Sequence, residues 1–185
     1  MRVFAALPLP RAIAAAAEDA LAPVRRLYPR LRWVPAKGMH VTLHFFGEVP
    51  DVEVAALQQL FGEPELCRPV IAARLGRLGQ FPPRGRPRVL WAGLEKGGDE
   101  MKSYWDLLEK KLAPLGFTAD ARGFSPHITV ARAGSTPVEG GWDAGVEMPA
   151  GDFFVAECVL FQSILGREGS EYVSLERITF ERAKA

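Results

Sequence analysis

The chain has 185 residues, 48% of them hydrophobic and 24% charged, with a formal net charge of +1 at pH 7. This balance is typical of a globular protein that is long enough to bury a core without disulfides. The near-neutral charge argues against tight wrapping of long nucleic acid, which needs many phosphate contacts. A small anionic substrate or one end of an RNA is compatible with it, and we expect a single domain over residues 1–185.

The two cysteines and the N-terminus indicate where the protein resides. Cys67 and Cys158 are too few for a disulfide scaffold and form no CxxC pair, so free thiols in a reducing cytoplasm are expected. The apolar N-terminal run is short and interrupted by prolines, which favours a strand and a helix over a signal peptide. No stretch approaches the 18 consecutive apolar residues of a membrane span. We therefore expect a cytoplasmic protein without a membrane contact.

The predicted elements follow one another in an α+β order, with antiparallel or mixed sheets and outer helices. Asp51 is the expected N-cap of the second helix. In chain order, periodicity and turn residues predict the strand Arg2–Leu7, the helix Pro10–Tyr28, the extended piece Arg32–Val34, the strand His40–Phe46, the helix Val52–Phe61, the strands Val70–Leu75 and Arg88–Leu94 separated by a turn-rich stretch at 79–87, the helix Asp99–Leu115, the strand His127–Ala131, a loop at 134–151, and the strands Asp152–Ser163 and Glu171–Phe180 joined by a hairpin turn.

One short pattern occurs twice. Two of the three histidines open the pattern His, apolar, Thr, apolar, at His40–Leu43 and at His127–Val130. Alternate side chains of a strand point to opposite faces, so each copy presents an imidazole and a hydroxyl together and buries its apolar residues on the other side. A single copy is a weak signal, because short motifs have many false positives. Two copies on two of only three histidines are far less expected by chance.

Phosphodiester chemistry suits two such strands placed face to face. Imidazole titrates near neutrality, so one histidine can accept a proton while the other donates one. The hydroxyls of Thr42 and Thr129 can donate hydrogen bonds to the non-bridging oxygens of a phosphate. No cluster of metal ligands accompanies the motifs, so we expect acid–base catalysis with no metal and no cofactor. From the residues alone, either of His40 and His127 could be the base.

The motifs and their surroundings resemble the two-histidine (2H) phosphoesterase superfamily. Within it, the chain is most similar to the bacterial and archaeal RNA 2′,3′-cyclic phosphodiesterases, historically called 2′-5′ RNA ligases. The resemblance covers nearly the full length. Many members have Lys where this chain has His44. The matching segments are 2–10, 32–34, 40–49, 87–93, 115–117 and 122–132, with Gln162, Ser163 and Tyr172 near the C-terminus.

The resemblance implies two pseudo-symmetric α+β lobes around an active-site cleft, with one motif on a central strand of each lobe. It implies hydrolysis of the 2′,3′-cyclic phosphate at RNA 3′ ends to a 2′-phosphate. In that reaction His127 is the proton acceptor and His40 the proton donor, while Thr42 and Thr129 hold the phosphoryl oxygens. The expected partners are RNA 3′ ends or cyclic-phosphate nucleotides, and a monomer is the expected state.

Three polar residues near the motifs are candidates for binding substrate. His44 shares the face of His40 if the strand stays regular, although a strand-end histidine with no role is an equal alternative. Arg132 and Arg122 flank the second motif and suit an oxyanion or an RNA phosphate. Strict alternation places Arg132 on the face opposite His127, so a role for it requires a strand end or a β-bulge.

Aromatic and basic residues further along the chain are weaker candidates. Phe46 is the first choice for stacking on the terminal base, followed by Phe124 and Trp33. The segment 81–88 carries three arginines in a proline-rich loop, with Arg77 nearby, and could contact the RNA backbone. The alternative is a solvated loop, which describes most runs of charge.

Other functions are compatible with the same residues. The same site could join RNA ends through a 2′-5′ bond, with an RNA hydroxyl in place of water as the attacking group. It could act on a small nucleotide such as a cyclic ADP-ribose derivative, or form a non-catalytic module that binds RNA ends. The intact pair of motifs argues against the last of these.

Overall fold

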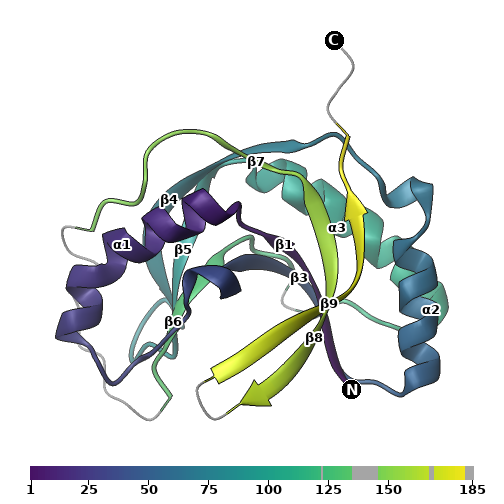
Figure 1. Ribbon diagram of the computed structural model, residues 1–185, viewed down its shortest axis with the longest axis horizontal. Coiled ribbons are helices and arrows are strands. Elements are labelled where there is room, and N and C mark those ends of the chain that lie inside the picture. The colour runs from purple at the N-terminus through teal and green to yellow at the C-terminus, as the bar shows by residue number, and fades with distance from the viewer. Residues whose placement is uncertain (122, 135–145, 167–168, 182–185) are drawn as a thin grey trace.

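The computed structural model describes residues 1–121, 123–134, 146–166 and 169–181 (Figure 1). Within these ranges the α-helices are α1 (Arg11–Leu27), α2 (Asp51–Phe61) and α3 (Gly98–Leu112), and short 3-10 helices span Ala36–Gly38, Pro64–Leu66 and Ala113–Leu115. The strands are β1 (Arg2–Pro8), β2 (Arg32–Trp33), β3 (His40–Glu48), β4 (Ile71–Phe81), β5 (Val89–Lys96), β6 (Ile128–Arg132), β7 (Phe153–Val155), β8 (Glu157–Gly166) and β9 (Gly169–Thr179).

The helices bury apolar stripes of helical period, as the sequence predicts. The buried residues of α1 are Ala14, Ala17, Leu21 and Val24. Those of α3 are Met101, Tyr104, Leu108 and Leu112. Helix α2 contacts β8 and β9, and α3 contacts β4 and β5. Among the described residues, no helix is both long enough and apolar enough to cross a membrane.

The strands form one sheet in the order β7-β4-β5-β6-β3-β1-β8-β9, with β2 beside β6. Every pair of named strands is antiparallel. The order is symmetric about its centre, because the unit β5-α3-β6 repeats the unit β1-α1-β3. We call β3, β1, β8 and β9 the His40 half, and β6, β5, β4 and β7 the His127 half. The predicted α+β fold is confirmed.

The two halves meet at the strands that carry the motifs. Strands β3 and β6 pair through Val41 and Ile128, the apolar second residues of the two motifs. Both side chains are buried, with 1% of their surface exposed. The residues with the highest local similarity in the sequence therefore lie next to each other in the fold.

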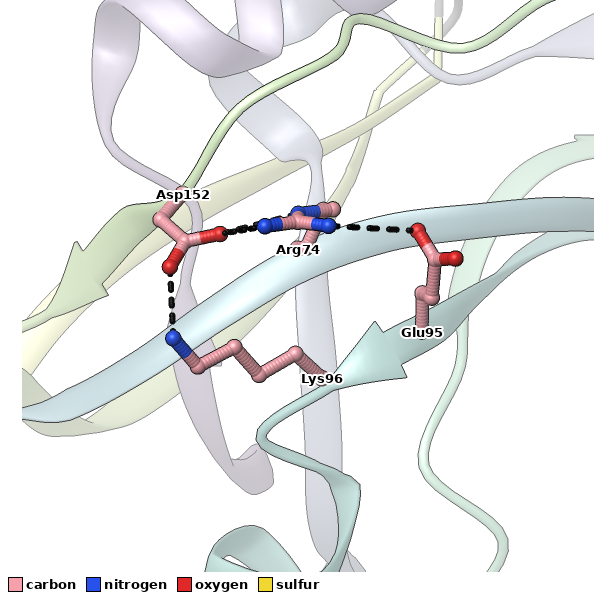
Figure 2. A network of polar contacts seen from close by, with 4 residues as sticks. All are labelled: Arg74, Glu95, Lys96 and Asp152. Carbon is pink, nitrogen blue, oxygen red and sulfur yellow. Dashed lines mark hydrogen bonds and ion pairs between the residues drawn. The ribbon is translucent and has the colours of Figure 1, made fainter.

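One predicted strand is in fact two strands. The segment predicted as Asp152–Ser163 is interrupted at Ala156, so β7 pairs with β4 in the His127 half while β8 pairs with β1 in the His40 half. Asp152, just before β7, makes two hydrogen bonds to side chains of β4 and β5 (Figure 2). Its Oδ1 accepts a hydrogen bond from Arg74 Nε at 2.8 Å, and its Oδ2 accepts one from Lys96 Nζ at 2.5 Å. The chain thus crosses from one half of the sheet to the other over a single residue.

Two local expectations are wrong. The N-cap of α2 is Pro50, and Asp51 is the first helical residue. The negative carboxylate of Asp51 still interacts favourably with the positive end of the helix dipole there. Strand β4 runs on through Gly79 to Phe81, although glycine predicts a turn there. A Cβ at Gly79 would collide with the indole of Trp91 on β5, so this glycine serves close packing.

Candidate active site

The strand register places the two motifs on one face of the sheet. Because Val41 lies opposite Ile128 in an antiparallel pair, His40 lies beside Thr129, and Thr42 lies beside His127. Each motif's histidine is therefore next to the other motif's threonine. We call the side of the sheet that carries these four residues the histidine face, and all four are half-buried there.

A β-bulge follows each motif at the same place. On β3, Thr42 pairs with Ala6 and His44 with Ala5, so Leu43 is the extra residue. On β6, Thr129 pairs with Trp91 and Ala131 with Leu90, so Val130 is the extra residue. The extra residue is the third after the histidine in both motifs. Each bulge reverses the alternation of side chains beyond it.

Each bulge turns the fifth residue after its histidine to the histidine face. Arg132 pairs with Val89, which lies two residues from Trp91 on β5, so Arg132 shares the face of Thr129. This is the bulge that a role for Arg132 required. In the other half, Phe45 is the equivalent residue. It pairs with Phe4, and 66% of its surface is exposed.

The same bulge removes two predicted residues from the site. His44 shares a face with Ala5 and Val41, opposite His40, so the prediction that it extends the site is wrong. It is 7% exposed, and its Nδ1 lies 2.6 Å from Oε1 of Glu109 on α3. The ring of Phe46 packs against that of His44, with centroids 4.5 Å apart, and not against His40 or His127.

His127 is held between aromatic rings and a backbone carbonyl. Its Nδ1 lies 2.7 Å from the carbonyl oxygen of Ser125. Because a carbonyl only accepts, Nδ1 carries the proton, and in the neutral ring Nε2 keeps its lone pair. The ring centroid lies 5.0 Å from that of Phe81 and 6.2 Å from that of Trp91.

His40 has a corresponding setting in its own half. Its ring lies 5.0 Å from Phe4, 5.4 Å from Tyr172 and 6.4 Å from Phe161, between centroids. It also makes a hydrogen bond with the backbone of Gly38, which favours the protonated ring. Gly38 and Ser125 each lie two residues before their histidine, so the two rings are oriented in the same way.

Burial controls the charge of both histidines. The pKa of His40 is lowered to about 4, mainly by burial. The hydrogen bond with the Gly38 backbone raises this pKa, while the positive charge of Arg132, and that of His127 when it is protonated, lower it. Burial, followed by Arg132, also lowers the pKa of His127. Both rings are therefore neutral at pH 7. Arg132 acts electrostatically on both histidines and shares their face of the sheet.

The remaining predicted residues lie in different places. Arg122 falls outside the described residues. Phe124 stacks on Trp105 of α3, with centroids 5.4 Å apart and rings 9° from parallel. The indole N–H of Trp33 donates to the carbonyl of Tyr28 at 3.0 Å. Both aromatic rings thus have packing roles.

The arginine loop begins at the site. Phe81, whose ring contacts His127, is the last residue of β4, and the exposed arginines Arg84, Arg86 and Arg88 follow it. Within the described ranges, no group of three or more His, Cys, Asp or Glu side chains is placed to hold a metal ion.

Sequence reasoning missed several residues of the site. They are the aromatic rings around the two histidines and the exposed ring beyond the first bulge: Phe4, Phe45, Phe81, Trp91, Phe161 and Tyr172. The resemblance covers Phe4, Phe45, Trp91 and Tyr172 but gives none of them a role beside the histidines. Most of these rings come from strands that are distant in sequence from the motifs, and Phe45 requires knowledge of the bulge.

Comparisons with known proteins show the family of this chain. The family described as LigT like Phosphoesterase matches residues 7–91. The chain is 33% identical over 153 residues to an RNA 2′,3′-cyclic phosphodiesterase of Aeropyrum pernix, covering 80% of this chain and 85% of the relative. It is 31% identical over 194 residues to one of Thermus thermophilus, with 97% and 90% coverage. The crystal structure of Escherichia coli LigT complexed with 3′-AMP superposes with a TM-score of 0.80, at 27% identity over 98% of each chain.

Paired His-x-Thr motifs on adjacent central strands of an antiparallel sheet define the class of two-histidine phosphoesterases. Within this class, the chain belongs to the LigT-like phosphoesterase family, together with these RNA 2′,3′-cyclic phosphodiesterases.

Proposed function

We propose that this protein hydrolyses the 2′,3′-cyclic phosphate at RNA 3′ ends and leaves a 2′-phosphate. The observation that carries the proposal is the pairing of Val41 with Ile128, which brings two histidines and two threonines to one face. The relatives named RNA 2′,3′-cyclic phosphodiesterase support the substrate. The complex of the E. coli neighbour with 3′-AMP supports a nucleotide as the kind of ligand.

In the proposed reaction, the oxygen of a water molecule attacks phosphorus while His127 Nε2 accepts a water proton. The bond from phosphorus to the ribose 3′ oxygen breaks, and His40 donates a proton to that oxygen. Thr42 and Thr129 donate hydrogen bonds to the non-bridging oxygens as negative charge develops. The products are a 2′-phosphate and a free 3′-hydroxyl. The two histidines then exchange their protons with solvent.

The tautomer of His127 supports its role as base, since the contact with Ser125 leaves Nε2 unprotonated. His40 must carry a proton when the substrate is bound, although its pKa within the fold is about 4. An anionic phosphate beside the ring favours the imidazolium and raises that pKa. Binding of the substrate thus favours the protonated form of His40, the proposed acid.

Arg132 and Phe45 have different proposed tasks. The guanidinium of Arg132 acts electrostatically on both histidines and suits a phosphate group of the substrate. Phe45 lies on the histidine face with an exposed ring, so we propose that the terminal base stacks on Phe45 in place of the predicted Phe46.

The state and location of the protein are also proposals. We infer that the protein works as a monomer, because one chain supplies both motifs of the site. The free thiols Cys67 and Cys158 support a cytoplasmic location. Light scattering at micromolar concentration and fractionation of the source cells would test the two statements.

The deciding experiment incubates the protein with an oligoribonucleotide that ends in a 2′,3′-cyclic phosphate and identifies the product. A 2′-phosphate is expected. A ligated RNA would favour the 2′-5′ ligase alternative, and an unchanged substrate would overturn both. His40→Ala and His127→Ala should each abolish turnover but keep the fold by circular dichroism. Full activity in EDTA is expected, and loss of activity on chelation would contradict the metal-independent mechanism.

A further inference from the structure

Two arginines lie directly opposite each other at the end of β6. Arg32 on β2 pairs with Arg132 on β6. Arg132 also pairs with Val89 on β5, two residues from Trp91, which pairs with Thr129. Because paired residues share a face, both arginines stand on the histidine face.

These two cations have no counter-charge in the described part of the chain. Every ion pair there involves other residues, and exposed arginines elsewhere do have carboxylate partners: Arg74 with Asp152 and Arg177 with Glu157. Like charges directly opposite on neighbouring strands destabilise a sheet. The chain as a whole has a net charge of only +1, so the pair is not one part of a generally basic surface. An anion between the two guanidinium groups would remove the repulsion.

The backbone beside the pair makes room for Arg32. Gly134 has a φ of +57°, and a Cβ at this position would come within 3.0 Å of an Arg32 guanidinium nitrogen. The glycine thus lets the guanidinium lie close against the chain just beyond β6. Arg32 is thereby placed beside Arg132 at the end of the strand.

The pair lies at a defined spacing from the motifs. Because Val130 is the extra residue of the bulge, Arg132 lies only two strand positions beyond Thr129, as Val89 lies two beyond Trp91, which is about 7 Å of strand. The positive charge of Arg132 also acts on both histidines at this spacing. A second anion bound at the arginines would therefore lie about one nucleotide away from a phosphate held between the histidines.

We propose that Arg32, together with Arg132, binds a second phosphate of the substrate: the phosphodiester on the 5′ side of the terminal nucleotide. Guanidinium groups suit this ligand, because they donate paired hydrogen bonds to phosphate oxygens. The inference rests on the proposed function. A contact to this second phosphate explains how the site selects the end of an RNA over a free cyclic mononucleotide.

The test compares kcat/KM for three substrates: adenosine 2′,3′-cyclic phosphate, the same compound with a 5′-phosphate, and the dinucleotide ApA with a 2′,3′-cyclic end. The wild-type protein should prefer the dinucleotide over the first compound by about ten-fold or more. Arg32→Gln should reduce that preference about ten-fold, and Arg32→Lys should reduce it less. Arg26→Gln, an exposed change of equal charge on α1, should keep the preference. Thermal melting checks that each variant folds.

Each result decides the inference. A gain from the 5′-phosphate alone that is lost in Arg32→Gln supports recognition of the phosphate group. A preference that Arg32→Gln leaves intact would overturn the inference, because it would assign the gain to the second base or ribose. If the wild-type protein hydrolyses none of the three, the proposed function fails. Calorimetry with ApA 3′-phosphate and adenosine 3′-phosphate then decides the inference, which requires the dinucleotide to bind tighter and Arg32→Gln to remove the difference.

Discussion

His44 and Glu109 connect the two halves of the protein through a buried contact. His44 Nδ1, on β3 of the His40 half, lies 2.6 Å from Oε1 of Glu109 on α3, the helix between β5 and β6 of the His127 half. Only Val41 and Ile128 pair directly between β3 and β6. The contact therefore provides a further link between the two halves.

Removing either partner should leave a buried polar group unsatisfied. We expect Glu109→Gln or His44→Gln to lower the free energy of unfolding by about 1–3 kcal/mol. The double variant should lose less than the sum of the two single losses. Urea unfolding at pH 7 measures all three. The control is Asp106→Asn, which breaks an exposed pair with Lys102 on the same helix and should cost less than about 1 kcal/mol. Equal, additive losses would show that the two residues do not interact.

The buried His40 should make stability depend on pH in one direction. Its pKa is about 4 in the folded protein and near 6.5 in the unfolded chain, so the unfolded chain binds the proton more readily between these values. Stability is complete above pH 6.5 and falls as the pH drops toward 4, by at most about 3 kcal/mol. His40→Gln should flatten this part of the urea-midpoint profile between pH 4.5 and 7.5. An unchanged profile would show that His40 is not the group responsible.

The two threonines should matter for the reaction and little for the fold. We expect Thr42→Val and Thr129→Val each to lower kcat by about 100- to 1000-fold, the usual cost of one lost donor to a developing oxyanion. Thr179→Val, on the exposed end of β9, is the control and should keep full activity. Steady-state kinetics on the cyclic-phosphate substrate measure the loss. A change in KM alone would assign these hydroxyls to ground-state binding.

The neighbouring residues Phe45 and Phe46 should differ in what they affect. Phe45→Ala should raise KM about ten-fold with little change in stability, because a stacked base is worth about 1–3 kcal/mol. Phe46→Ala should lower the free energy of unfolding by about 1–3 kcal/mol, because its ring packs on His44 and Phe117. Kinetics and urea unfolding of both variants give the comparison. The reverse pattern would show that Phe46 is the residue that contacts the base.

Gly79 should tolerate no side chain. A methyl group there overlaps the Trp91 indole, which packs beside His127. We expect Gly79→Ala to displace the indole, reduce stability by about 1–3 kcal/mol and lower activity. Gly47→Ala, at a position with open space around it, separates the cost of steric overlap from that of a positive φ. Trp fluorescence and thermal melting report the displacement. Unchanged spectra in Gly79→Ala would contradict it.

The chemistry of the site could be predicted from the sequence alone. Each motif contains its own information, because alternation along a strand places His40 with Thr42 and His127 with Thr129 without reference to any other element. The apolar residues Val41 and Ile128 likewise indicate the buried side. The helices were predictable for the same reason, since a stripe of apolar residues at helical spacing is a local property.

Only the tertiary structure decided which residues surround the histidines. A β-bulge is a mismatch between two strands, so the bulges at Leu43 and Val130 depend on how β3 pairs with β1 and how β6 pairs with β5. One extra residue in each strand turns His44 away to Glu109 and brings Phe45 and Arg132 to the histidine face. The chain alone specifies two histidines with their threonines. Long-range pairing selects the residues beside them, because the face of a side chain beyond a bulge is set by its partner strand.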